Sequence, residues 1–473
     1  MSTASAALAL LSASDLIEGF AARRFSPVDA LDAVLAQLDL LEPELNAFCF
    51  LDRESARAQA QASAARWERG QPQGLLDGVP VSVKDIILTA GWPTLRGSRT
   101  VDPAQDWRED GPAVARLREH GAVLFGKTTT PEFAFKGVTD SPLTGVTRNP
   151  WDTRLTPGGS SGGASAAVAA GIAPLALATD AGGSVRIPAS FTGTFGHKPS
   201  GGRVAMYPPT PYATLAGFGP ISRTVRDAAL MMSVIAQPDP RDWEADLSAP
   251  PRYDLELDAA QPSQWRIAFS PTLGYVDVAL EVLEIVDHAV EIFRTLGAQV
   301  DVVEHVFDDP WPILARYKRG LTAYAFRAMP PSRFAEMDPA LVAEIEESQG
   351  AGLDEHLSAQ MERAGLARRM SDFHQAYDLL LTPTLATPPF AIGRNAPEGY
   401  EGRAWYGFTF PFNLTRQPAA SVPCGLTQNG LPVGLQIVGP ARDDLRVLQA
   451  ARAFERVNPW PLTAPIATRN DRP

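Results

Sequence analysis

The amino-terminal part of the chain carries apolar residues at the spacing of amphipathic helices. Ser26 and Pro27 form a typical helix start, because a serine caps the first turn and a proline is tolerated at the first helical position. Apolar residues then recur every three or four positions, at Leu31, Val34, Leu35, Leu38 and Leu41. An alanine-rich, charged stretch predicts a further helix from about Arg53 to Arg69. The first 70 residues are therefore predicted to be helical.

From about residue 75 onward, short apolar runs alternate with helical patterns. The runs predict strands at Val79–Val83, Ala122–Phe125, Leu175–Thr179, Trp265–Ser270, Gln299–Val303, Tyr377–Thr382, Ala419–Pro423 and Val433–Val438. Helical patterns cover Pro112–His120, Ser161–Gly171, Val276–Leu296 and Leu445–Val457, and a mostly helical stretch runs from about 310 to 376. Residues 236–264 are rich in proline and aspartate and read as a surface linker. The alternation of strands and helices is typical of a layered α/β fold.

Composition narrows the class of protein. The chain has 473 residues, of which 45% are apolar and 20% charged, so it can build a large packed core. Its net charge of −12 disfavours nucleic acid and anionic membranes as partners. The two cysteines, Cys49 and Cys424, cannot form a disulfide framework, and the first twelve residues lack the pattern of a signal peptide. We therefore expect a cytoplasmic protein.

Two short motifs imitate catalytic signatures. Gly121–Thr128 matches the phosphate-binding pattern G-x-x-x-x-G-K-[ST], but the predicted strand lies inside the motif instead of before it. Gly158–Gly162 matches the nucleophile elbow G-x-S-x-G, yet no strand runs into Ser160. The six histidines show neither metal-ligand spacing nor a late histidine with an evident acidic partner. Nucleotide binding, a Ser-His-Asp triad and a metal centre are all disfavoured.

A lysine and two serines in glycine-rich stretches are candidates for catalysis that needs no histidine. Lys84 follows a buried strand, and burial disfavours the charged form of a lysine, so that it can act as a base. Ser160 lies in a glycine-rich turn before a helix, and Ser184 follows Gly182 and Gly183. Glycines just before a hydroxyl leave backbone N–H groups accessible, as an oxyanion hole requires. Each glycine-rich stretch taken alone is better explained as a tight turn.

Taken together, these motifs resemble the amidase signature family. The family's central stretch runs from a Gly-Gly-Ser-Ser-Gly-Gly loop to a Gly-Gly-Ser-x-Arg-x-Pro-Ala segment, here Gly158–Gly163 and Gly182–Ala189. Ser160 and Ser184 lie 24 residues apart, as in the family. Further segments that look like the family are Gly78–Asp85, Gly126–Phe133, Asn149–Asp152, His197–Ser200, Asn413–Pro423 and Gly430–Gln436. The resemblance covers roughly residues 10–235 and 375–455.

The resemblance implies a role for each member of this set. Ser184 resembles the nucleophile, Ser160 the bridging serine that the family holds after a cis peptide, and Lys84 the base. Asp180 and Arg186 are expected to fix the nucleophile loop. The implied oxyanion hole consists of backbone N–H groups of the nucleophile and of Ala181, Gly182 and Gly183.

Four further residues are expected to contact the substrate. Ala134 falls where relatives line the acyl pocket, and Gly159 and Ser161 flank the bridging serine. Arg416 stands where relatives usually have glycine, so its charge faces either the pocket or solvent. These positions bear on substrate choice and leave the catalytic set untouched.

The implied fold is α/β, a single large α/β/α layered domain with a mixed central sheet over residues 1–473. Within it we expect a helical amino-terminal segment (1–70), a catalytic core (71–235), a variable region (236–375) and a carboxyl-terminal part of the core (376–473). No metal or organic cofactor is implied, and a homodimer is compatible with the family.

The implied activity is hydrolysis of small-molecule amides, including aryl amides, through a serine acyl-enzyme. Esters and carbamates present the same carbonyl, so they stay open as substrates. One alternative is the ammonia-producing component of a glutamyl-tRNA amidotransferase complex, which shares the fold and the triad. A non-catalytic scaffold is the other alternative, and the intact set of Lys84, Ser160 and Ser184 argues against it.

Overall fold

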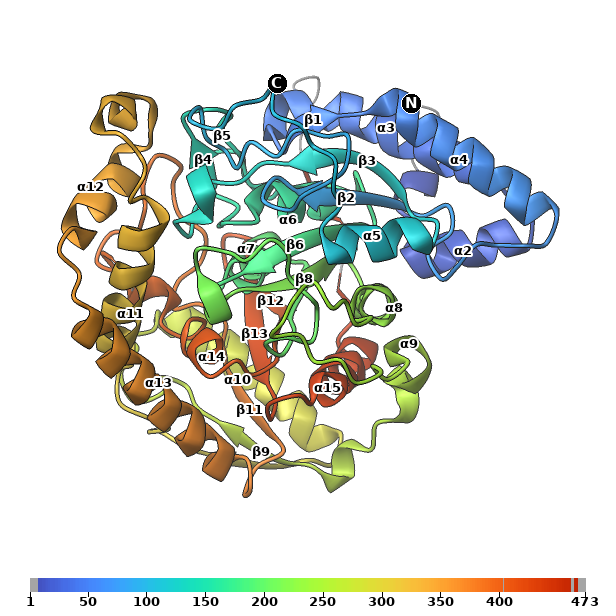
Figure 1. Ribbon diagram of the computed structural model, residues 1–473. Helices are drawn as coiled ribbons and strands as arrows, with labels where there is room; N and C mark the ends of the chain where they lie inside the picture. The colour runs from blue at the N-terminus through green and yellow to red at the C-terminus, as the bar shows by residue number, and fades with distance from the viewer. Residues whose placement is uncertain (1–6, 403, 461–462, 467–473) are drawn as a thin grey trace.

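A mixed sheet runs through the centre of the computed structural model, which describes residues 7–402, 404–460 and 463–466 (Figure 1). In this part of the chain the sheet has 11 strands in the order β1-β3-β2-β6-β8-β7-β12-β13-β11-β9-β10. The strands of this sheet are β1 (Phe48–Leu51), β2 (Pro80–Lys84), β3 (Val123–Thr128), β6 (Leu175–Asp180), β7 (Phe195–Lys198), β8 (Gly217–Ser222), β9 (Arg266–Phe269), β10 (Gln299–Val302), β11 (Leu379–Pro383), β12 (Ala419–Leu426) and β13 (Pro432–Val438). β4 (Asp140–Ser141) and β5 (Gly145–Val146) form a separate hairpin.

The central sheet contains two groups of parallel strands, separated by a group of antiparallel strands. β2 is parallel to both β3 and β6, and β9 is parallel to both β10 and β11. The strands between these blocks, from β6 to β11, pair antiparallel. The sheet is therefore mixed, as the resemblance implied.

Helices surround this sheet. They are α2 (Ala13–Ala21), α3 (Pro27–Leu45), α4 (Arg53–Glu68), α5 (Pro112–Glu119), α6 (Gly162–Ala169), α7 (Arg186–Thr192), α8 (Val225–Ile235), α9 (Tyr253–Glu256), α10 (Leu280–Thr295), α11 (Trp311–Ala325), α12 (Pro339–Ser348), α13 (Leu353–Phe373), α14 (Pro411–Leu414) and α15 (Asp444–Val457). Figure 1 shows α11, α12 and α13 as an outer arc on the opposite side of the molecule from α3 and α4. No helix among the described residues is long and apolar enough to cross a membrane.

The alternation of side chains along β6 explains the layers. Leu175 and Leu177 join the large apolar cluster that also contains residues of α5, α8 and α15. Ala176 and Ala178 belong to a second cluster, in which they pack with residues of α6. Successive strand residues point to opposite faces, and the small alanines let the backbone of α6 approach the sheet closely. This close approach places the residues just before α6 beside the ends of the central strands.

The amino-terminal prediction is confirmed for its helices but wrong for one segment. Ser26 caps α3 through a reciprocal capping box with Asp29, and Pro27 is its first residue. β1 interrupts the helical segment and pairs antiparallel with β3 at the edge of the sheet. Its four residues, Phe-Cys-Phe-Leu, are too short a run to stand out against the helical periodicity on both sides.

Other elements were not predicted. β7, β8, α7 and α8 lie between Arg186 and Ile235, where glycines and prolines obscure the periodicity. The predicted linker at 236–264 contains the short helix α9, whose Tyr253 is buried. The phosphate-binding look-alike is the strand β3: Lys127 is fully buried there and donates to the Ile87 carbonyl over 2.6 Å. Both cysteines, Cys49 and Cys424, are free thiols.

Candidate active site

Two parallel strands and one helix start bring the predicted catalytic residues together. In the register of β2 and β6, Val83 lies opposite Leu177, so Lys84 and Thr179 lie near the carboxyl ends of neighbouring strands. In open α/β sheets, polar side chains at these strand ends form the ligand site. The turn before α6 adds Ser160 and Ser161 to the same edge.

Lys84 makes three short contacts in a buried environment. Its Nζ lies 2.7 Å from Ser160 Oγ, 2.9 Å from Ser161 Oγ and 2.8 Å from Thr179 Oγ1, and none of its surface is exposed. A neutral amine has two N–H donors and one lone pair, which match three hydroxyl partners. Because the Ser161 hydroxyl donates to the Thr179 carbonyl over 3.1 Å, its oxygen is available as an acceptor for Lys84. One N–H is thus assigned to Ser161, and the second N–H and the lone pair are left for the hydroxyls of Ser160 and Thr179.

Burial sets the protonation state of this lysine. Desolvation lowers the pKa of Lys84 well below its ordinary value of 10.5, and the charge of Asp180 opposes that shift only in part. No carboxylate among the described residues lies within ion-pair distance of Nζ to stabilise an ammonium group. A buried amine without a counter-ion favours the neutral form, which can accept a proton.

The loop before α6 packs so closely against neighbouring backbone that it has no room for a side chain at Gly159. The Gly159–Ser160 peptide is cis. A Cβ on Gly159 would lie 2.7 Å from the backbone of Val138, so only glycine fits there. Gly159 and Ser161 are not among the residues that line the cavity beside Ser184, and their contact with substrate stays a prediction. Gly159 instead packs against the backbone, and Ser161 holds Lys84.

The turn after β6 presents Ser184 and its neighbouring amides. The Asp180 carboxylate accepts hydrogen bonds from the N–H groups of Gly183 (2.7 Å) and Val185 (3.1 Å). The Gly183 N–H thus already has an acceptor in this structure, and its role as an oxyanion donor stays a prediction. The N–H groups of Ala181, Gly182 and Ser184 have no acceptor among the described residues. Three amides of this turn, two before Gly183 and one after it, are therefore free among the described residues.

A buried charge pair holds this turn in place. Arg186 binds both carboxylate oxygens of Asp180, at 2.9 and 3.0 Å, and also donates to Asn413 and Gln436. Burial alone would raise the pKa of Asp180, but the charge and hydrogen bonds of Arg186 outweigh it and lower the pKa. Thr409 Oγ1 donates to the Gly182 carbonyl over 2.7 Å, which fixes the orientation of that peptide.

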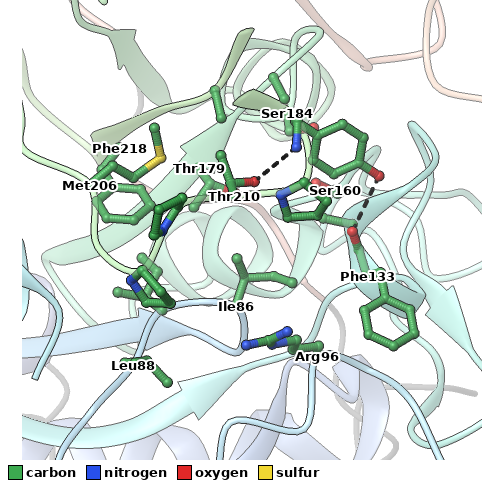
Figure 2. A pocket seen from close by; sticks show the side chains of 18 of the residues that line it. Ile86, Leu88, Arg96, Phe133, Ser160, Thr179, Ser184, Met206, Thr210 and Phe218 are labelled. Carbon is green, nitrogen blue, oxygen red and sulfur yellow. Dashed lines mark hydrogen bonds between the residues drawn. The ribbon is translucent and has the colours of Figure 1, made fainter. Parts of the chain in front are cut away.

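Ser184 lies where two chambers meet. Ala134, Ala181, Ser184 and Tyr212 line both of them. The first chamber, which also contains Ser160 and Thr179, has a mostly apolar wall that includes Ile86, Leu88, Phe133, Met206, Phe218 and the proline-rich segment 207–211 (Figure 2). The second chamber extends toward α11. Ala134 thus lies beside the nucleophile candidate, on a turn where Phe133 and Ala134 both adopt left-handed backbone conformations.

Arg416 does not reach either chamber. Its guanidinium lies 3.7 Å from the Glu244 carboxylate, and its side chain packs against Gly201. Its contact with substrate therefore stays a prediction, since Arg416 is not among the residues that line the two chambers. The backbone of Arg416 is left-handed, with φ of 61°, which is the conformation that glycine adopts at low cost.

Sequence reasoning missed several residues of the site. Thr179 was predicted only as the end of a strand, although its place beside Lys84 follows once β2 and β6 are known to be parallel neighbours. Thr409 and Tyr212 lie far along the chain from the serines and carry no local motif. Their proximity to the site is a property of the tertiary structure alone.

Comparison with known proteins agrees with this geometry. A profile of the Amidase family matches residues 29–448. The chain belongs to the amidase family. An acylamidase from Rhodococcus erythropolis is 36% identical over 471 residues, with 95% of this chain and 96% of the relative covered. A glutamyl-tRNA(Gln) amidotransferase subunit from Roseiflexus sp. (strain RS-1) is 35% identical, with 95% of this chain and 97% of the relative covered.

The solved structures agree in fold. The structure of a bacterial aryl acylamidase of the amidase signature family superposes with a TM-score of 0.89 at 30% identity, with 95% of this chain and 96% of that chain covered. The α/β fold with its mixed sheet is thus that of the amidase signature enzymes. This amidase is a hydrolase that acts on the carbon–nitrogen bond of amides.

Proposed function

We propose that this amidase cleaves small carboxylic amides through an acyl-enzyme on Ser184, with Ser160 as the proton relay and Lys84 as the base. The observation that carries the proposal is the contact of 2.7 Å between Lys84 Nζ and Ser160 Oγ inside a fully buried site. A serine is a weak nucleophile until an adjacent base accepts its proton. The chain supplies that base without a histidine or a metal ligand.

The proton moves along the three side chains in the proposed mechanism. Ser184 Oγ transfers its proton to Ser160 Oγ, which passes its own proton to Lys84 Nζ, and Ser184 attacks the substrate carbonyl. The negative oxygen that forms is held by the free N–H groups of Ala181, Gly182 and Ser184. By analogy with single-donor deletions in other hydrolases, each donor contributes about 3 kcal/mol to transition-state stabilisation. Ser160 then protonates the leaving amine as the C–N bond breaks, and Lys84 returns its proton to Ser160.

Water completes the cycle by the same route. A water molecule gives a proton to Ser160 and attacks the acyl-enzyme carbonyl, and the bond to Ser184 Oγ breaks as that oxygen regains a proton. The apolar wall of the first chamber supports aryl or alkyl groups on the substrate. Esters and carbamates offer the same carbonyl to the same serine, and we propose them as secondary substrates.

A second candidate function is ammonia production within an amidotransferase complex. It is favoured by the 35% identity to a glutamyl-tRNA(Gln) amidotransferase subunit. Glutamine carries a carboxylate and an ammonium group, and no aspartate or glutamate that could bind the ammonium group is among the residues that line the two chambers. An ammonium ion without a carboxylate partner is costly in a partly buried site, so this observation favours the stand-alone amidase.

A fluorophosphonate probe tests the proposal, because it labels only an activated serine. Intact-protein mass should show one adduct on the wild type and none on Ser184→Ala. The control Ser165→Ala, in α6 and hydrogen bonded to Thr192 and Thr194, should keep the adduct. An adduct that persists on Ser184→Ala would assign the nucleophile elsewhere. No adduct on the wild type, with ammonia release from glutamine only after partner proteins are added, would favour the second candidate.

A further inference from the structure

One cationic side chain beside the nucleophile candidate has no counter-ion. Arg96, Lys136 and Lys318 are the lysines and arginines among the residues that line the two chambers. Lys136 lies 2.6 Å from Asp140 and 2.7 Å from Asp338, and Lys318 lies 2.8 Å from Glu344. The guanidinium of Arg96 has no ion-pair or hydrogen-bond partner among the described residues. Among the described residues, the first chamber therefore holds one positive charge without an ion-pair partner.

The backbone around Arg96 is anchored on both sides. Its φ of 59° is left-handed, and its carbonyl accepts a hydrogen bond of 2.8 Å from the N–H of Phe133. The Asp85 carboxylate accepts from the next N–H group on either side, at Leu95 (3.2 Å) and Gly97 (3.4 Å). A left-handed conformation is costly for arginine and is retained where surrounding contacts determine it. The anchored turn fixes where the side chain enters the chamber.

The guanidinium of Arg96 lies in partly apolar surroundings, which do not stabilise a positive charge. Figure 2 shows the Arg96 side chain beside Ile86, on the other side of the chamber from Thr179 and Ser184. Desolvation lowers the pKa of Arg96, and the charge of Asp85 raises it only in part. A guanidinium nonetheless stays protonated in proteins, so the charge persists at every working pH. In the free protein the planar guanidinium therefore has N–H donors without acceptors, and the geometry of these donors matches the two oxygens of a carboxylate.

We propose that Arg96 binds a carboxylate on the substrate, remote from the scissile carbonyl, so that the preferred substrates are amides bearing an additional acid group. This inference rests on the proposed function, since it assigns the substrate class of the same site. A neutral aromatic group could stack on the guanidinium, but it would leave the charge uncompensated. A carboxylate neutralises the charge and satisfies two donors at once.

Matched substrate pairs test the assignment. On the acyl side the pair is glutaryl 4-nitroanilide and 5-oxohexanoyl 4-nitroanilide, in which a methyl ketone replaces the carboxylate. On the amine side the pair is N-acetyl-4-aminobenzoate and N-acetyl-4-aminoacetophenone. The readout is kcat/KM for amine release, and the two pairs also show which part of the substrate faces Arg96.

Three proteins are compared: wild type, Arg96→Met and the control Arg99→Met, an exposed arginine on the same loop. We expect the wild type to prefer the acid of at least one pair by about tenfold or more, the usual worth of charged hydrogen bonds. Arg96→Met should lose that preference while its kcat/KM for the ketone changes less than about threefold. Arg99→Met should keep the preference.

The outcomes separate this inference from the proposed function. The inference is overturned if the wild type shows equal kcat/KM within both pairs, or if the preference for the acid survives in Arg96→Met. In either case, fluorophosphonate labelling of Ser184 would still support the proposed function. If the enzyme turns over none of these substrates, calorimetric titration with glutarate and 4-aminobenzoate decides instead. Binding that weakens about tenfold in Arg96→Met supports the assignment, and no binding, or equal binding, refutes it. Loss of 4-aminoacetophenone binding to the same extent would favour aromatic stacking.

Discussion

Replacement of Lys84 by methionine tests the proposed relay most directly. Methionine keeps an unbranched side chain but removes the nitrogen that contacts Ser160, Ser161 and Thr179. Ser184 and its free amides are unchanged. The variant thus isolates the contribution of the base from that of the nucleophile and the oxyanion donors.

The expected loss of activity is large. General-base catalysis contributes about 10²–10⁴-fold to a rate, so kcat of Lys84→Met should fall by about this factor. KM should change little, because Lys84 does not line either chamber. Saturation kinetics on a chromogenic anilide measures both quantities.

The expected change in stability is small, because two effects oppose each other. Removal of the amine leaves the hydroxyl oxygens of Ser161 and Thr179 without a donor, but it also removes a polar group that is costly to bury. We therefore expect the free energy of unfolding to stay within about 1 kcal/mol of the wild-type value. Urea unfolding followed by circular dichroism measures it and shows that the variant folds.

The pH profile gives an independent test of the same residue. Because burial lowers the pKa of Lys84, the wild-type kcat/KM should rise as pH increases through that lowered value, where the base becomes neutral. In the unfolded chain the lysine keeps its ordinary pKa of 10.5, so between the two values the unfolded state binds more protons. The free energy of unfolding should therefore rise with pH in this window, and Lys84→Met should lack that contribution to both curves.

A second buried lysine provides the matched control. Lys198 is buried, burial lowers its pKa to about 7, and its Nζ donates to the Pro199 carbonyl away from the chambers. Lys198→Met should retain activity within about threefold of the wild type. The relay is refuted if Lys84→Met keeps kcat within about tenfold of the wild type while folding normally.

Two further predictions concern residues around the site. Asp180→Asn should lower the free energy of unfolding by about 3–5 kcal/mol, measured in urea, because it leaves the buried Arg186 guanidinium without its carboxylate. A loss below about 1 kcal/mol would mean that the pair does not hold the turn. Arg416→Gly should leave kcat/KM within about twofold of the wild type, since Arg416 lies outside the chambers, and relief of its left-handed backbone should keep the melting temperature equal or higher. A selective change in KM on a substrate panel would contradict this placement.

Local signals in the sequence predicted many of the elements and the candidate catalytic residues. Ser26 and Pro27 predicted the start of α3 because capping depends on residues within one helical turn. The glycine-rich turns around Ser160 and Ser184 predicted their position before a helix and after a strand, because such turns are encoded by adjacent residues. Burial of Lys84 followed from the apolar run that precedes it.

The partners of those residues were decided only by the tertiary structure. Thr179 meets Lys84 because β2 and β6 are parallel neighbours, and strand order is set by long-range pairing that no local pattern encodes. The Gly183 N–H donates to Asp180, and Arg416 lies beside Glu244, because the folded chain brings these groups together. The importance of Arg96 also became visible only in the folded chain: it is the one arginine among the described residues that line the first chamber, and no carboxylate of the described residues forms an ion pair with it.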